Sequence, residues 1–189
     1  SRYRAAGADG IYAFNWHADA DRRRLLLTQI GSQDTLQATD RVYAATHRFL
    51  VYEGQWRGAY RPDRLLGQGP VPLRQTLTEV GPVVDLMVVD DFSVEPAQRV
   101  ELRLHLCEWV EGDEILVKWD GQALTAPVYT LDLTGDGTGV SRIGGAVWLR
   151  FGLQPGGIAP GSHSVETILL RRHPQLACDL VLTDVELAV

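Results

Sequence analysis

The stretch Arg99–Leu124, RVELRLHLCEWVEGDEILVKWDGQAL, decides the fold class expected for this chain. From Val100 to Cys107 apolar residues alternate with polar ones, which is the period-two pattern of a strand with one buried and one wetter face. The turn residues Glu111–Asp113 interrupt this pattern, and it resumes over Ile115–Trp119. The stretch predicts a β-hairpin at the centre of a β-rich core, followed by a second tight turn at Asp120-Gly121.

Segments of strand length continue on both sides of this hairpin. Gly, Pro or Asp clusters separate each segment from the next, and no helical pattern intervenes. The segments are Gln75–Val80 and Val83–Val89 before the hairpin, and Val128–Leu133, Ala146–Leu153, Ser164–Leu170 and Leu180–Val189 after it. About eight short strands at this spacing favour a mainly β fold, with an antiparallel jelly-roll β-sandwich over residues 72–189.

The composition limits the class of protein. The chain has 189 residues, of which 45% are hydrophobic, and this is enough for a packed core. Its 18 Lys and Arg residues are mostly scattered and are outnumbered by 24 Asp and Glu residues, so we expect no nucleic-acid partner. No apolar run approaches the roughly 20 residues of a membrane span, so no span is expected. The compartment stays open, and a secreted or periplasmic location is compatible with the sequence.

The N-terminal part of the chain follows a different pattern. Gly7 is placed to end a preceding helical turn, and Ile11–Phe14 is an apolar run of the kind buried on both faces in a parallel sheet. Asp19 and Asp21 then precede a helix expected over Arg22–Ile30. This order indicates one βα unit, which needs parallel neighbours for its strand.

Two less regular segments separate this unit from the strands. Ser32–Thr46 is expected to hold one short helix, with Asp40 as its N-cap before Arg41–Ala45. Residues 49–71 include a stretch rich in Gly, Pro and Arg that has no sustained period. The second segment is therefore expected to connect two domains.

Two stretches of the N-terminal part resemble the closing βα unit of the TIM-barrel glycoside hydrolases and glycoside hydrolase-like proteins of bacteria. They are GADGIYAFNW at residues 7–16 and LLLTQIGSQDTLQATDRVY at residues 25–43. In that family the unit leads into a C-terminal β-sandwich, and DEILVKWDGQAL at residues 113–124 is similar to a hairpin of galactose-binding-like sandwiches.

This resemblance implies a domain layout and a partner. Residues 1–48 would close a (β/α)8 barrel, residues 49–71 would form the connection, and residues 72–189 would form the sandwich. The partner would be an upstream barrel domain of the same parent chain. Because the catalytic carboxylates of such enzymes lie on earlier barrel strands, no catalytic residue is expected within this chain.

The candidate sugar-contacting residues are Asn15, Trp16, Trp56, Tyr60 and Trp109. Side chains at the carboxyl end of a barrel strand face the active site, which is where Asn15 and Trp16 would lie. There, Trp16 would stack on a sugar ring and Asn15 would hydrogen-bond a hydroxyl group. Sealing of the barrel rim by Trp16 and capping of a loop by Asn15 explain the two residues equally well.

The other aromatic candidates differ in their expected exposure. Trp56 and Tyr60 fall in the connection, where loops often carry binding residues. Trp109 shares the wetter phase of its strand with His105 and is expected to be exposed. Trp119 and Trp148 could also contribute to a sugar-binding platform, but most large aromatics, Trp119 above all, are expected in the core of the sandwich.

No complete metal or cofactor site is predicted. Cys107 and Cys178 are expected to be buried free thiols and not zinc ligands, with a disulfide as the alternative if the parent protein is secreted. Residues 132–137, DLTGDG, open like a calcium loop, but Ile143 stands where such a loop needs a glutamate at its twelfth position. A glycine-rich turn is therefore favoured, and a structural calcium ion is the alternative.

Together these patterns lead to one functional expectation and two alternatives. The chain is expected to be the C-terminal β-sandwich region of a carbohydrate-active, glycoside hydrolase-like protein, where it braces the barrel and contacts sugar. A non-catalytic module that binds carbohydrate or protein is the first alternative, and a purely structural domain is the second.

Overall fold

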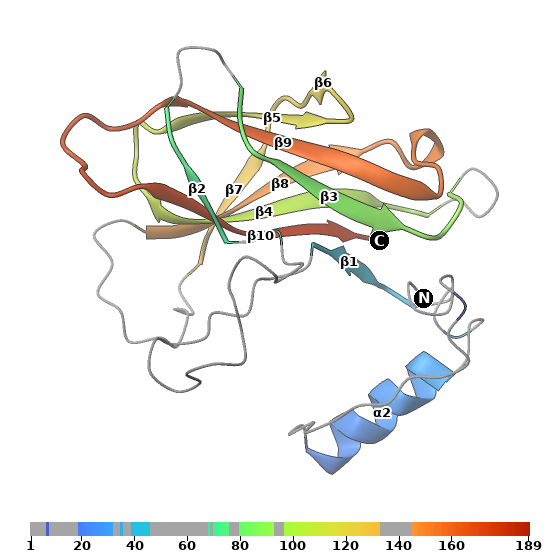
Figure 1. Cartoon of the computed structure of the whole chain (residues 1–189). Helices are drawn as coiled ribbons and strands as arrows, with labels where there is room; N and C mark the ends of the chain where they lie inside the picture. The colour runs from blue at the N-terminus through green and yellow to red at the C-terminus, as the bar shows by residue number, and fades with distance from the viewer. Residues whose placement is uncertain are drawn as a thin grey trace, which may run out of the picture.

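The computed structural model describes residues 7, 19–31, 35, 39–45, 68, 70–75, 80–92, 97–132 and 145–189 (Figure 1). These residues form a mainly β structure with antiparallel strand pairing throughout. The elements are α2 (Ala20–Gly31), β1 (Val42–Ala44), β2 (Val71–Leu73), β3 (Val83–Val88), β4 (Val100–Trp109), β5 (Glu114–Trp119), β6 (Gln122–Ala123), β7 (Val128–Asp132), β8 (Gly145–Leu153), η2 (Pro155–Gly157), β9 (Gly161–Arg171) and β10 (Leu180–Ala188).

The strands form two sheets that lie face to face (Figure 1). The six-stranded sheet has the order β1-β10-β4-β8-β7, and β2 also pairs with β10. The four-stranded sheet has the order β3-β9-β5-β6. Strands that are distant in sequence are thus neighbours in each sheet, as in β10 beside β4.

One hydrophobic core holds the two sheets together. The alternation of β4 places Leu102, Leu104 and Leu106 on one face, where their side chains are fully buried. Core residues of the four-stranded sheet, such as Leu86 and Val165, belong to the same cluster. The described strands therefore form a β-sandwich, which confirms the mainly β fold predicted from the alternation.

The predicted hairpin over residues 100–119 is wrong in its pairing, although both strands exist. Strand β4 pairs with β10 and β8, whereas β5 pairs with β9 and β6 in the opposite sheet. The connection at Val110–Asp113 therefore crosses from one sheet to the other. The two-residue hairpin lies at the following turn, between β5 and β6, where Asp120 and Gly121 both have positive φ angles.

Within the segment at residues 32–46, the helix expected to follow an N-cap at Asp40 is also wrong. Val42–Ala44 forms strand β1, which pairs antiparallel with the end of β10 at Glu186–Ala188. Tyr43 is buried because its position in β1 faces the core, and its ring packs edge-on against Phe92 with centroids 6.5 Å apart. The burial of Tyr43 in the sandwich core outweighs the local N-cap signal at Asp40.

Helix α2 confirms the helix expected near residues 22–30. Asp19 caps it, because its Oδ1 accepts a hydrogen bond of 2.9 Å from the backbone N–H of Arg22, and this bond lowers the pKa of Asp19. Leu25 and Leu27 are 59% and 53% exposed, and Figure 1 shows α2 standing apart from the sandwich. Among the described helices, none is long and apolar enough to cross a membrane.

Candidate functional site

The face of the six-stranded sheet that points away from the core is here called the outer face. It carries a group of polar and aromatic side chains. The group comprises Glu101, Arg103, His105, Trp148, Arg150 and Glu186. These residues alternate with core residues along β4, β8 and β10. The strand register places Arg103 opposite both Arg150 and Glu186, and His105 opposite Trp148. Pairing across the sheet therefore gathers residues that are more than 40 positions apart in sequence into one surface.

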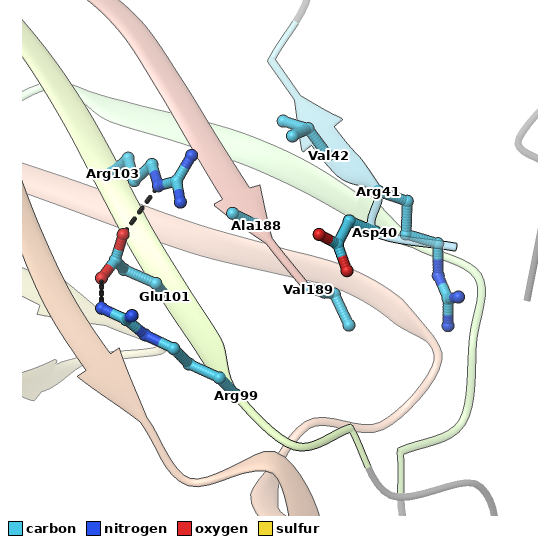
Figure 2. Close-up of a pocket in the computed structure, with 8 residues that line it drawn as sticks. All are labelled: Asp40, Arg41, Val42, Arg99, Glu101, Arg103, Ala188 and Val189. Carbon is cyan, nitrogen blue, oxygen red and sulfur yellow. Dashed lines mark hydrogen bonds and ion pairs between the residues drawn. The ribbon is translucent and has the colours of Figure 1, made fainter. Parts of the chain in front are cut away.

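Glu101 is the buried centre of this outer face, with only 4% of its surface exposed. Its Oε1 accepts a hydrogen bond of 2.7 Å from Arg103 Nε, and its Oε2 accepts one from Arg99 Nη2 (Figure 2). Arg150 Nη1 lies 4.0 Å from Glu101 Oε1. Burial would raise the pKa of Glu101, but these arginines outweigh it and lower the pKa. An ionised glutamate thus holds the guanidinium groups of Arg99 and Arg103 in place.

A hollow of about 400 Å³ opens beside this cluster. Figure 2 shows Arg99, Glu101 and Arg103 along its β4 side, and Asp40 on its β1 side across the end of β10. The hollow is lined by Asp40, Arg41, Val42, Arg99, Glu101, Arg103, Ala188 and Val189. Its walls therefore offer both cationic donors and a carboxylate acceptor over a small apolar floor.

A second hollow of about 240 Å³ adjoins the first on the same outer face. It is lined by Arg103, Thr130, Trp148, Arg150 and Glu186, so Arg103 stands between the two hollows. Trp148 supplies an aromatic surface, and its neighbours supply hydrogen-bond donors and acceptors. The combination suits a ligand that has apolar C–H groups together with several hydroxyl groups.

His105 lies against Trp148, with ring centroids 4.7 Å apart and an interplanar angle of 37°. Its Nδ1 is 2.5 Å from Thr183 Oγ1 and 3.4 Å from Asp184 Oδ2. Burial would lower the pKa of His105, but the carboxylate of Asp184 and the neighbouring Cys107 outweigh it and raise the pKa to about 9. A protonated imidazole therefore packs against the indole at neutral pH, which fixes the position of Trp148.

A second cluster, on the four-stranded sheet, contains Ser164, His163 and Asp120 but is not arranged for nucleophilic catalysis. His163 Nδ1 lies 2.7 Å from Asp120 Oδ2, and its Nε2 lies 2.7 Å from the carbonyl oxygen of Ala159. Ser164 Oγ hydrogen-bonds Asp120 and not the imidazole. Because both ring nitrogens are occupied and Trp119 stacks on the ring, this cluster anchors the β5–β6 turn.

Trp109 is the one predicted site residue whose placement is described. A β-bulge at Glu108, whose φ is 64°, interrupts the alternation of β4 between Cys107 and Trp109. Trp109 is therefore half-buried, packs against the core and lies 5.8 Å from Tyr129, measured between ring centroids. An uninterrupted alternation predicted that Trp109 and His105 share one face of the sheet. The bulge places Trp109 on the other face.

The other predicted site residues, Asn15, Trp16, Trp56 and Tyr60, lie outside the described residues. The same holds for residues 133–143 of the calcium-like loop, of which only Asp132, at the end of β7, is described. Over the described part of the chain, no group of three or more His, Cys, Asp or Glu side chains is placed to hold a metal ion. Cys107 and Cys178 are both free thiols; Cys107 is buried, as predicted, whereas Cys178 is only partly buried.

Arg103 and Arg150 are not singled out by the sequence, and Trp148 is grouped with the large aromatics that are mostly expected in the core, yet a signal for Trp148 and Arg150 is present. The strand AVWLRF places Trp148 and Arg150 in the polar phase of β8, alternating with Val147 and Leu149. An aromatic residue in the polar phase of a strand is a candidate for an exposed binding surface. Trp148 lies near Arg103 only because β4 pairs with β8, and the sequence carries no local signal for this pairing.

Neither a protein-family model nor a curated protein matches this sequence.

Proposed function

We propose that this chain is the C-terminal region of a carbohydrate-active, glycoside hydrolase-like protein, and that its sandwich contacts sugar through the outer face. The observation that carries the proposal is the hollow beside Trp148, which combines an aromatic side chain with Arg103, Arg150, Thr130 and Glu186. Any hydrolysis would depend on carboxylates of the parent's barrel, and no residue of this chain is assigned a catalytic role.

The chemistry of this hollow matches that of a pyranose. A sugar ring presents C–H bonds on its faces, which pack on an aromatic ring, and hydroxyl groups around its rim. Arginine side chains donate hydrogen bonds, a glutamate accepts them, and a threonine does both. The hollow therefore has a partner for each part of the sugar within one small space.

The proposal extends to the architecture of the parent protein. In it, the sandwich is a jelly roll and the N-terminal residues complete a TIM barrel, as the resemblance implies. Helix α2 supports this extension, because it makes no extended packing contact with the described strands and exposes Leu25 and Leu27. A helix with exposed leucines is suited to packing against other helices of a barrel. The sandwich would then brace that barrel.

Affinity electrophoresis against a panel of soluble polysaccharides tests the sugar contact. We expect at least one polysaccharide to retard the chain, Trp148→Ala to abolish the retardation, and Trp148→Phe to keep part of it. Tyr129→Ala is the matched control, because Tyr129 is an exposed aromatic residue that lines neither hollow. If no polysaccharide retards the unaltered chain, the sugar contact is refuted and the sandwich is left with a structural role alone.

A further inference from the structure

The arginines of the second hollow have more hydrogen-bond donors than the described chain satisfies. A guanidinium group carries five N–H donors and no acceptor. Arg103 uses its Nε for Glu101, at 2.7 Å. Arg150 interacts more weakly with Glu101, because its Nη1 is 4.0 Å from Glu101 Oε1. Its buried Nε has no hydrogen-bond acceptor among the described residues. Both side chains are thus suited to a ligand that brings strong acceptors of its own.

The local charge also favours an acidic ligand. Three guanidinium groups, those of Arg99, Arg103 and Arg150, face the single buried carboxylate of Glu101. With Glu186, which lines the same hollow, two carboxylates stand against three guanidinium groups, so the cluster keeps one net positive charge within a chain whose net charge is −6. A carboxylate can accept two parallel hydrogen bonds from one guanidinium group, whereas a neutral hydroxyl cannot, so the charged ligand gains more from Arg103 or Arg150.

The remaining walls of the hollow suit the rest of a sugar acid. Glu186 lines the hollow and accepts hydrogen bonds, so it matches sugar hydroxyl groups and not the ligand's carboxylate. Thr130 can bond to either kind of group, and Trp148 offers its ring to the C–H face. A uronic acid ring carries all three complementary features, whereas a simple carboxylate or a neutral hexose lacks at least one.

We infer that the hollow formed by Arg103, Thr130, Trp148, Arg150 and Glu186 selects sugars that carry a carboxylate, the uronic acids. The acid group is bound by Arg150 and Arg103, the hydroxyl groups are bound by Glu186 and Thr130, and the ring lies against Trp148. This inference rests on the proposed function, because it assigns a sugar class to the same surface.

Calorimetric titration of the full chain tests this selectivity. The ligands are oligogalacturonates and oligoglucuronates, their methyl esters, which keep the hydroxyl groups but lose the charge, and the neutral polysaccharides of the affinity panel. We expect at least one free acid to bind about tenfold more tightly than its ester, with a preference that weakens as salt is added. Arg150→Gln should remove the preference, and Arg150→Lys should keep part of it because the charge remains without the fork geometry.

Arg171→Gln is the matched control for Arg150→Gln. Arg171 is also a strand arginine paired with a glutamate, Glu114, but it lies on the four-stranded sheet and lines neither hollow. Thermal unfolding of each variant confirms that it is folded, and if Arg150→Gln does not fold, Arg150→Lys decides the test. A preference that Arg171→Gln removes equally would overturn the inference, because general charge would then explain it.

The outcomes separate this inference from the proposed function. Equal binding of acids and esters, or binding of neutral polysaccharides alone, overturns the acidic selectivity and leaves the sugar contact standing. No binding of any acid, ester or neutral polysaccharide overturns both. An acid preference that depends on Arg150 but not on Arg171 supports both.

Discussion

The proton on His105 stabilises the folded sheet at neutral pH. Since the pKa of this buried histidine is raised from 6.5 to about 9, the folded chain holds the proton more tightly than the unfolded chain does. Its contribution is therefore complete below pH 6.5 and is lost as the pH rises through 9. The largest possible value is about 3 kcal/mol, because a tenfold difference in proton affinity between the two states is worth about 1.4 kcal/mol.

We expect His105→Gln to remove this pH dependence. The free energy of unfolding of the unaltered chain, measured with urea from about pH 6 to about pH 9.5, should fall towards that of the variant as the pH rises. The same loss should weaken the packing of His105 on Trp148, so sugar affinity should fall over the same range. A difference between the two proteins that stays constant across the range would contradict this assignment of the proton.

Gly81 is a position where the backbone leaves no room for a side chain. A Cβ atom there would lie 2.0 Å from the carbonyl oxygen of Thr167, in the backbone of β9. Two hydrogen bonds hold the backbone at residues 81–82 close to β9. Thr167 N–H donates one of 3.1 Å to the carbonyl oxygen of Pro82, and Gly81 N–H donates one of 3.1 Å to the side chain of Glu166.

We expect Gly81→Ala to lower the free energy of unfolding by about 2 kcal/mol or more, because β3 must move away from β9. Gly152→Ala is the control, since a Cβ atom at this strand glycine meets nothing within 4 Å. Chemical denaturation of both variants checks the expectation. Equal stability of the two alanine variants would show that β3 and β9 are not packed as closely as described.

At the scale of elements, Asp113 holds the crossing between the two sheets. Its side chain is completely buried and accepts hydrogen bonds from Val110 N–H at 3.1 Å and His173 N–H at 2.8 Å. It also pairs with Arg172, which in turn donates to the carbonyl oxygen of Cys178. One carboxylate thus ties the β4–β5 connection to the β9–β10 connection.

We expect Asp113→Ala to cost about 3–5 kcal/mol of stability, because it leaves Arg172 and two backbone N–H groups buried without this acceptor. Glu114→Ala is the matched control. Its partner Arg171 is the last residue of β9, directly before Arg172, and this pair is more than half exposed, so its loss should cost less than about 1 kcal/mol. Thermal or urea unfolding measures both, and similar losses in the two variants would exclude the anchoring role of Asp113.

The same elements show how far the sequence predicts this structure. Period-two alternation correctly locates β3, β4, β5, β8, β9 and β10, since each strand has one face in the core. It does not predict that β4 and β5 lie in opposite sheets, because a turn that reverses a hairpin and one that crosses a sandwich both use Gly and acidic residues. Nor does it predict the bulge at Glu108, which turns Trp109 away from the face of His105.

The candidate site is less predictable than the strands for a related reason. Glu101, Arg103 and Arg150 are ordinary polar-phase residues in the sequence, and they become one cluster only because β8 pairs with β4 at a specific register. Register is set by the whole core and not by the residues of the site. Local patterns can therefore nominate Trp148 and Arg150, but only the assembled sheet places them beside Arg103.

At the scale of the whole molecule, β1 is the N-terminal limit of the sandwich among the described residues. Tyr43 contributes to the core, and its hydroxyl group hydrogen-bonds Asp90. Arg41 Nε lies 2.5 Å from the same carboxylate, and its guanidinium group lies over the ring of Phe92. By contrast, α2 has no extended packing contact with the described strands. The sandwich should therefore depend on residues 41–44 but not on α2.

Two N-terminal deletions test this limit. Removal of residues 1–38 should leave a folded chain whose thermal midpoint changes little, because β1 and its contacts remain. Removal of residues 1–45 also takes away the Tyr43 ring and leaves Asp90 without Arg41, which should cost about 3 kcal/mol and lower the midpoint by about 6–12 °C. Circular dichroism of both proteins on heating measures the difference. Should the shorter deletion already unfold the chain, the sandwich would need the N-terminal segment for its own stability, and α2 would have to be counted as part of the same cooperative unit.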